Sequence, residues 1–166
     1  MAPMKCINGI TLALFIPVFY ACHNPLTDRS PGLKNVTIIF PKGEKNTNGN
    51  FTGEVWLKSL VDPDILNETA VGNVTFAPGA RSKWHAHPAG QIILVTAGLG
   101  YYQEEGQEKR ILRKGDVVKC PANIPHWHGA STDSSFVQVA ITGRQKGPTK
   151  WFASVTDAEY FAKASQ

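Results

Sequence analysis

The chain has 166 residues, of which 42% are hydrophobic and 18% are charged, and its formal net charge is +4. This length and apolar fraction suit one domain with a core of ordinary size. No run of Lys and Arg reaches five residues, so we assign the small positive excess to a solvated surface and exclude a nucleic-acid partner.

The first 22 residues differ from the rest of the chain. Lys5 is their only charge, an apolar stretch runs over residues 10–21 with Pro17 inside it, and the segment ends at Cys22. A positive start, a short hydrophobic region and a small residue before a cleavage point are typical of an export signal. The apolar stretch is shorter than the ~20 residues of a membrane span. We therefore predict a signal peptide over residues 1–22.

Cys22 directly follows a small residue at the end of this segment, which resembles a bacterial lipobox, although Phe19 stands where Leu is usual. We expect an exported protein in the periplasm or cell envelope, with a lipid anchor on Cys22 as its only membrane contact. A plain signal peptide and an uncleaved anchor are the alternatives. The remaining domain keeps one cysteine, Cys120, so an internal disulfide is excluded and Cys120 is expected to be a small buried hydrophobe.

Residues 23–50 are predicted to form a polar tether and one N-terminal strand, at 36–40, followed by a loop at 46–50. Over residues 51–166, short runs rich in β-branched residues follow at the spacing of an all-β barrel or sandwich. The predicted strands cover residues 53–59, 70–76, 91–97, 100–103, 109–112, 116–119 and 135–142. Glycine-containing turn signals separate them, among them Ala97-Gly98.

The C-terminal segment changes character. Thr156 and Glu159 have the spacing of a capping box, in which a hydroxyl begins a helix and a carboxylate follows three residues later. This pattern predicts one short helix over residues 157–164, with Tyr160 and Phe161 packed on the barrel.

Three histidines and a glutamine form a candidate metal site. His85 and His87 lie two residues apart and so share one face of an extended strand, and Gln91 shares that parity if the chain stays extended past the intervening proline. His126 must then arrive from a different strand, with His128 on the same face of it. Converging neutral imidazoles are the commonest means of holding a transition metal.

The donor set indicates the chemistry that such a site favours. Three neutral imidazoles and one amide would leave the full charge on a divalent ion, which would attract small anions or developing oxyanions. Four protein ligands on an ion that prefers six leave about two positions open, and open positions favour catalysis. His128 is the candidate general acid or base, or an orienting partner. Gln138 is the polar residue in an otherwise apolar run and is predicted to face the cavity. An apolar lining is expected from Phe76, Ile93, Val95 and Phe136.

Two stretches match a known family in their internal spacing. Gly79, His85, His87, Gln91 and Gly98 resemble the first cupin motif, G-x5-H-x-H-x3-E-x6-G, with Gln in the Glu position. A later stretch resembles the second cupin motif, G-x5-P-x-G-x2-H-x3-N, through Gly115, Pro121 and His126. It departs from the motif at Asn123, which replaces the second Gly, and at Ala130, which replaces the final Asn. The resemblance covers residues 51–162 and implies an all-β jelly-roll barrel with a short C-terminal helix.

Within that family, residues 78–91, 125–130 and 155–160 are similar to the branch that contains bacterial hydroxynitrile lyases of the (R)-mandelonitrile lyase type. This resemblance implies metal ligands at His85, His87, Gln91 and His126, with manganese as the first choice and iron, zinc, cobalt or nickel as alternatives. It also implies a homodimer. Lyase members usually carry a histidine where this chain has Gln138, and that histidine handles the cyanohydrin proton. The departure counts against strong cyanohydrin cleavage and leaves the metal site intact.

The expected function is that of a metal-dependent enzyme acting on a small oxygen-bearing molecule by Lewis-acid chemistry of the lyase, isomerase or decarboxylase type. In this interpretation His128 moves a proton. Two alternatives stay open: an iron-dependent dioxygenase using the same ligands, and a barrel without enzymatic activity that binds a small ligand at the cell surface.

Overall fold

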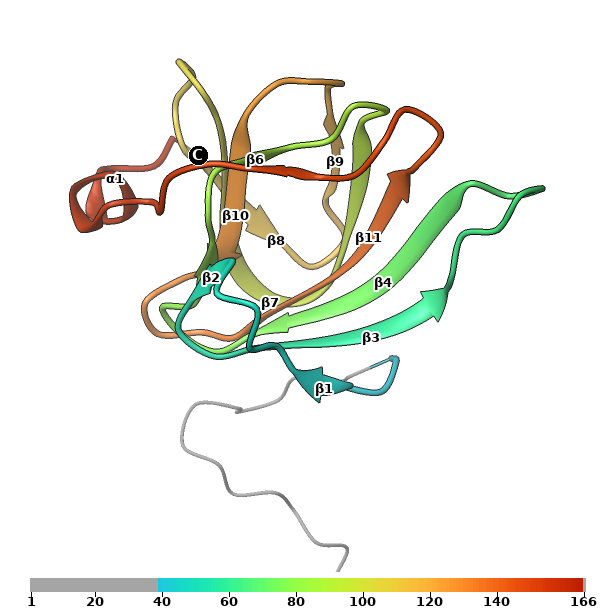
Figure 1. The fold of residues 1–166 in the computed structure, drawn as a ribbon. Helices are drawn as coiled ribbons and strands as arrows, with labels where there is room; N and C mark the ends of the chain where they lie inside the picture. Colours follow the sequence, from blue (N-terminus) through green and yellow to red (C-terminus); the bar gives the residue numbers. More distant parts are fainter. Residues whose placement is uncertain (1–38, 166) are drawn as a thin grey trace, which may run out of the picture.

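A computed structural model describes residues 39–165 and shows a barrel of antiparallel strands followed by one short helix (Figure 1). The predicted leader, most of the tether and residues 36–38 of the first predicted strand lie outside the described residues. The elements in chain order are β1 (Glu44–Lys45), β2 (Phe51–Thr52), β3 (Val55–Val61), β4 (Thr69–Phe76), β5 (Arg81–Ser82), β6 (His85–Ala86), β7 (Gln91–Glu104), β8 (Arg110–Arg113), β9 (Val117–Cys120), β10 (His126–Ala130), β11 (Phe136–Gly143), β12 (Lys150–Trp151) and α1 (Asp157–Phe161).

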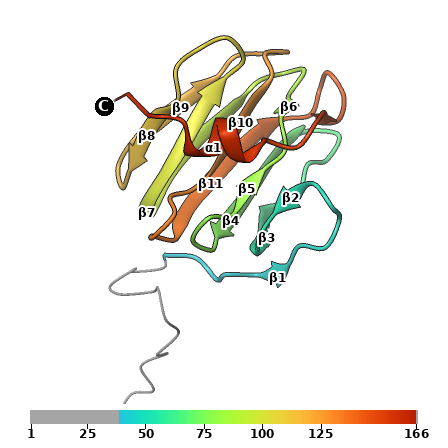
Figure 2. The same ribbon diagram turned by 90° about the vertical axis from the view of Figure 1, so that its left-hand side faces the viewer.

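The strands form one curled sheet whose main path runs β1-β3-β4-β11-β7-β10-β5-β2. β8 and β9 add to β7, while β6 pairs with both β10 and β12. Figures 1 and 2 show the strands curling around a common interior, with α1 outside the barrel beside β10 and β5. The predicted all-β barrel with a short C-terminal helix is confirmed.

β7 is the element that the sequence divides wrongly. The predicted turn at Ala97-Gly98 is a bend inside one continuous strand of 14 residues. The first part of β7 pairs with β9 and β11, and its last part pairs with β8 and β10. Gly98 has φ +77°, and a Cβ there would lie 1.8 Å from the Ser135 carbonyl oxygen. A glycine is therefore needed where the strand changes partners, and its turn signal reflects that bend.

The other predicted strands fall near their observed positions, with differences at the ends. Four of them agree to within one residue and became β4, β8, β9 and β11, whereas the run at 53–59 is displaced by two residues in β3. Ile39 and Phe40 lie in a bend, so the described part of the predicted strand at 36–40 is wrong. The two-residue strands β1, β2, β5, β6 and β12 are not predicted as runs, because two residues show no alternation.

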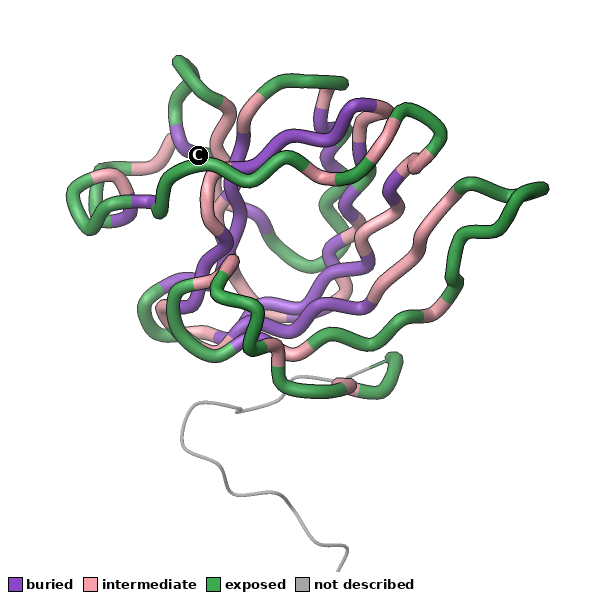
Figure 3. The backbone as a smooth tube through the Cα atoms, viewed as in Figure 1, coloured by how far each residue is buried: buried purple, intermediate pink, exposed green. Residues whose placement is uncertain are grey.

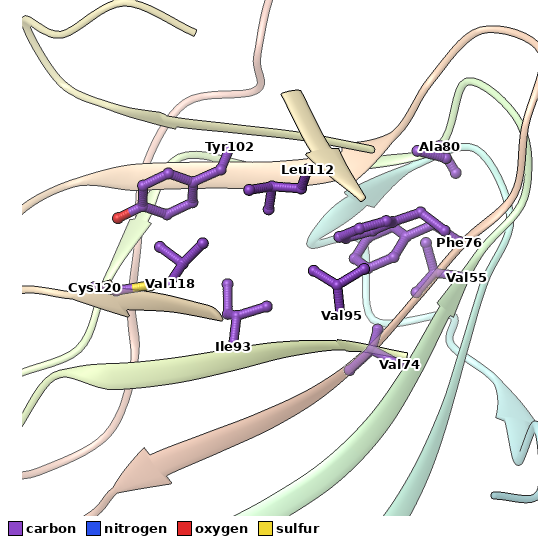
Figure 4. Close-up of a cluster of buried hydrophobic side chains, with 12 residues drawn as sticks. Val55, Val74, Phe76, Ala80, Ile93, Val95, Tyr102, Leu112, Val118 and Cys120 are labelled. Atoms are coloured by element: carbon purple, nitrogen blue, oxygen red, sulfur yellow. The ribbon is translucent and has the colours of Figure 1, made fainter. Parts of the chain in front are cut away.

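The barrel interior holds the main apolar core, and the buried backbone in Figure 3 follows β10 and the first half of β11. The core cluster comprises Val55, Val74, Phe76, Ala80, Ile93, Val95, Tyr102, Leu112, Val118, Cys120, Ala130 and Phe136 (Figure 4). Cys120 is buried, as expected. The predicted apolar pocket lining is wrong: its four residues belong to this packed cluster and do not line the cavity described below.

Helix α1 begins with the predicted capping box. Glu159 donates its backbone N–H to Thr156 Oγ1 at 3.2 Å, and the Glu159 carboxylate accepts from the Thr156 N–H at 2.7 Å. The helix ends at Phe161 rather than at 164, and Phe161 is 66% exposed, so its predicted packing on the barrel is wrong. Tyr160 is buried, and its hydroxyl donates to the Ala130 carbonyl. Over residues 39–165 no helix has the length and apolar character that crossing a bilayer requires.

Candidate metal-binding site

Two neighbouring strands and the chain after one of them bring the predicted ligands together. His85 on β6 pairs directly with His126 on β10, and their ring centroids are 4.4 Å apart. The ring of His87, just after β6, lies 5.1 Å from that of His85 and 5.4 Å from that of His126. Gln91 begins β7, after a turn in which the Gly90 N–H donates to the His87 carbonyl. Gln91 thus reaches the site through a turn and not through continuous strand parity.

Each of the four side chains is held at one atom by the protein. His85 Nδ1 contacts the Lys83 carbonyl at 2.9 Å, and His126 Nδ1 contacts the Ile124 carbonyl at 3.0 Å. A carbonyl only accepts, so Nδ1 of both rings carries the proton and Nε2 keeps its lone pair.

The remaining two side chains are held by hydroxyl groups. His87 Nδ1 is hydrogen-bonded to Thr149 Oγ1 at 3.1 Å, and Gln91 Nε2 donates to Thr142 Oγ1 at 2.8 Å. Buried and without hydrogen-bond partners among the described residues are His87 Nε2, His126 Nε2 and Gln91 Oε1. Buried polar atoms are normally satisfied, so these orphaned polar atoms fit a bound cation.

The electrostatics keep the imidazoles neutral. Burial lowers the pKa of His85 well below its usual value, and the neighbouring His128 and His126 lower it further. Burial, then His126 and then Arg144, lower the pKa of His87 to about 3. Burial also lowers the pKa of His126. Neutral imidazole is the form that binds metals, so this cluster needs no proton loss near pH 7 to accept one.

His128 differs from the other three histidines in having neither ring nitrogen hydrogen-bonded to the described residues. Its ring lies 5.1 Å from that of His85 and 5.6 Å from that of Phe76, which packs against it edge-on. Ligand atoms of His85, His126 and His128 come within 4.8 Å of one another, so these three side chains could also hold a metal ion. Of the four histidines of the site, three are therefore oriented by hydrogen bonds, whereas the ring of His128 is held by packing alone among the described residues.

Gln138 on β11 is fully buried, and neither its Oε1 nor its Nε2 has a partner among residues 39–165. It lines the same cavity as His128, as the sequence predicts. The cavity has a volume of about 540 Å³ and is walled largely by apolar side chains. These include Phe51, Leu57, Val71, Val74, Ala140 and Trp151. An apolar chamber with a few converging polar groups is the usual form of a small-molecule site.

Several residues of the site were not identified from the sequence. The sequence could have identified Thr142, because it lies four residues after Gln138 and so shares its face of the predicted strand. Thr149 and Arg144 come from the segment after β11, which has no periodic pattern. Trp151 on β12 pairs with His85 and stacks on its ring at 4.8 Å. A two-residue strand such as β12 gives no sequence signal.

A cupin domain family profile matches residues 72–142. The chain is 40% identical over 111 residues to a protein described as (R)-mandelonitrile lyase from Granulicella tundricola, covering 66% of this chain and 85% of that relative. This chain belongs to the cupin superfamily. A cupin-like protein from Thermotoga maritima, solved by crystallography, is 49% identical with a TM-score of 0.71 over 75% of this cupin and 95% of that chain. The DMSP lyase DddQ from Ruegeria pomeroyi shares the fold, at 23% identity and a TM-score of 0.52 over 58% of this cupin and 51% of that chain.

Proposed function

We propose that this cupin is a metal-dependent enzyme that acts on a small oxygen-bearing molecule, with chemistry of the lyase, isomerase or decarboxylase type. Three atoms support this proposal: His87 Nε2, His126 Nε2 and Gln91 Oε1. Each is buried and has no hydrogen-bond partner among residues 39–165, and each side chain is oriented by a hydrogen bond at its other end. The relative described as (R)-mandelonitrile lyase supports a lyase among these classes.

The residues that would hold the ion are His85, His87, Gln91 and His126, with manganese as the first choice and iron, zinc, cobalt or nickel as alternatives. When bound, a divalent ion would supply Lewis-acid polarisation of a substrate oxygen. All four protein groups are neutral, so they favour a substrate whose oxygen carries or develops negative charge.

His128 and Gln138 would act on the substrate from the cavity side. Neither nitrogen of the His128 imidazole is hydrogen-bonded to the part of the chain that the structure describes, so one of them would be available to take a proton from the substrate and return it. Gln138 can donate from its amide nitrogen and accept at its amide oxygen, so it would orient the substrate without moving a proton. The largely apolar walls of the cavity would strengthen both interactions by lowering the local dielectric constant.

Replacing His128 by Asn tests the division of roles. We expect His128→Asn to keep the metal and to lower kcat by about 10²–10⁴-fold on any substrate found in a screen of cyanohydrins, hydroxy acids and keto acids. Loss of the metal in this variant would instead make His128 a ligand, in the alternative three-histidine set. His23→Asn, in the predicted polar tether, is the matched histidine control.

Metal substitution separates the enzyme classes. Turnover with manganese or zinc in the absence of oxygen supports the lyase-type proposal, whereas strict dependence on iron and oxygen would indicate a dioxygenase. A His85→Ala protein that loses metal but keeps full ligand affinity would indicate the non-enzymatic binding protein.

We further propose that the protein is exported, anchored by lipid on Cys22 and homodimeric. The export-signal pattern of residues 1–22 supports the first two statements, and the cupin resemblance supports the third. Mass spectrometry of the N-terminal peptide from wild type and Cys22→Ala tests the anchor, and light scattering of the purified protein tests the dimer.

A further inference from the structure

The inward face of β11 carries a row of cavity-lining residues that ends in a cation. Gln138, Ala140 and Thr142 line the cavity at every second position of the strand, and Arg144 continues the row just beyond its end. Gln138 is fully buried, whereas Arg144 is half-buried. The row therefore leads from a buried amide to a guanidinium at the cavity mouth.

The guanidinium of Arg144 is tied to the ligand cluster. Arg144 Nη1 donates to Thr149 Oγ1 at 3.1 Å, and the same oxygen is hydrogen-bonded to His87 Nδ1. This contact fixes the side chain against the cavity wall, one hydroxyl away from a candidate metal ligand. An arginine held in this way is preorganised and loses little conformational freedom when it binds an anion.

The charge of Arg144 has no protein counterion. The ion pairs found over residues 39–165 are Lys45–Glu54 and Arg81–Asp157, so no carboxylate there neutralises Arg144. Asp62 is the other side chain with a full charge at the cavity, and its carboxylate accepts from Ser59 Oγ at 2.6 Å. Among the described residues the half-buried guanidinium of Arg144 has no anionic partner, so it is suited to a ligand that supplies a negative charge.

We propose that the cavity binds a small organic carboxylate, with the carboxylate on Arg144 and the rest of the molecule directed into the cavity past His87. The planar guanidinium matches a carboxylate in two parallel hydrogen bonds. The apolar walls formed by Val71, Val74 and Ala140 would take a short aliphatic or aromatic body. This inference deepens the proposed function and rests on it, because the same cavity would hold the substrate.

Two matched pairs of probes test the inference by calorimetry: mandelate against mandelamide, and lactate against lactamide. Each pair keeps its shape and changes one charge. In chelator-treated protein we expect at least one carboxylate to bind about tenfold more tightly than its amide. Arg144→Gln should abolish that preference without changing amide affinity, and Arg144→Lys should retain part of it. Lys146→Gln removes an exposed cation of the same segment and should change nothing.

The inference is overturned if neither carboxylate exceeds its amide in chelator-treated wild type, or if Arg144→Gln keeps the preference. A preference that appears only in metal-loaded protein and ignores Arg144→Gln would belong to the metal, so this inference would fail while the proposed function stood. If the protein binds no metal but shows a carboxylate preference that depends on Arg144, this inference would stand and the proposed function would fail. Thermal unfolding of each variant shows that it remains folded.

Discussion

Gln91 Nε2 donates to Thr142 Oγ1 at 2.8 Å, and the amide oxygen of Gln91 is buried with no hydrogen-bond partner in residues 39–165. An amide binds a hard or borderline cation through oxygen, so the hydroxyl of Thr142 selects the end of Gln91 that would face the ion. Thr142 lies on β11 and Gln91 on β7, and the two residues are directly paired in the sheet.

Removing this hydroxyl should weaken the metal site without disturbing the barrel. We expect Thr142→Val to lower metal affinity by about 10–100-fold, because the unrestrained amide must be ordered at each binding event. Competition with a chromophoric chelator measures the affinity. The control is Thr96→Val, which also removes a threonine hydroxyl from a strand. The Thr96 hydroxyl donates to the Val137 carbonyl and not to a site residue, so this variant should retain wild-type metal affinity. Equal affinity in both variants would show that the Thr142 hydroxyl does not position Gln91 for the metal.

The sequence predicts the site residues better than it predicts the groups that hold them by hydrogen bonds. His85, His126 and His128 could be placed from strand parity and from the spacing of two motifs, and the structure brings them together on β6 and β10. Their supports include the backbone carbonyls of Lys83 and Ile124, to which no side-chain pattern points. Such contacts depend on the backbone conformation that the fold imposes, which no local sequence pattern encodes.

In the fold, too, local patterns predict some features, whereas others depend on contacts between distant strands. Runs of β-branched residues predicted β4, β8, β9 and β11 because half-buried strands alternate in polarity. The bend at Gly98 was misread as a turn, since a left-handed glycine has the same sequence signal in both settings. Local chemistry predicts the bend, whereas the pairing of β7 with four other strands makes it part of one continuous element.

Metal removal should lower the melting temperature. A ligand present at 100 times its dissociation constant stabilises the folded state by about 2.7 kcal/mol, which corresponds to roughly 5–10 °C for a domain of this size. We expect a chelator to reverse this shift in wild type and in His23→Ala. His85→Ala should show no metal-dependent shift in differential scanning calorimetry. A shift that survives in His85→Ala would place the metal elsewhere.

The apo protein should lose stability as the pH falls below about 6.5. The pKa of His87 is about 3 in the folded protein, against an ordinary value of 6.5 in the unfolded chain. Between these values only the unfolded chain takes up the proton, so this stability is fully present above 6.5 and declines toward pH 3. Each buried histidine contributes up to about 1.4 kcal/mol per pH unit.

Urea unfolding of chelator-treated protein between pH 6.5 and 5 measures this slope. His87→Asn should reduce it by about one histidine's share, whereas His23→Asn should leave it unchanged. The predicted direction of the pH dependence of stability would be wrong if the apo protein became more stable as the pH fell through this range.

Cyanohydrin cleavage should be weak in wild type and should rise in Gln138→His. Gln138 is fully buried and lines the cavity, but its amide cannot carry a proton between substrate and protein. An imidazole at this position could do so, and a positioned acid or base contributes about 10²–10⁴-fold. We therefore expect kcat/KM for mandelonitrile to rise at least tenfold in the metal-loaded variant. Gln145→His, which adds a histidine at an exposed position, and Gln138→Asn, which keeps the amide, should show no gain. An unchanged rate in Gln138→His with full metal content would mean that proton transfer at this position does not limit cleavage.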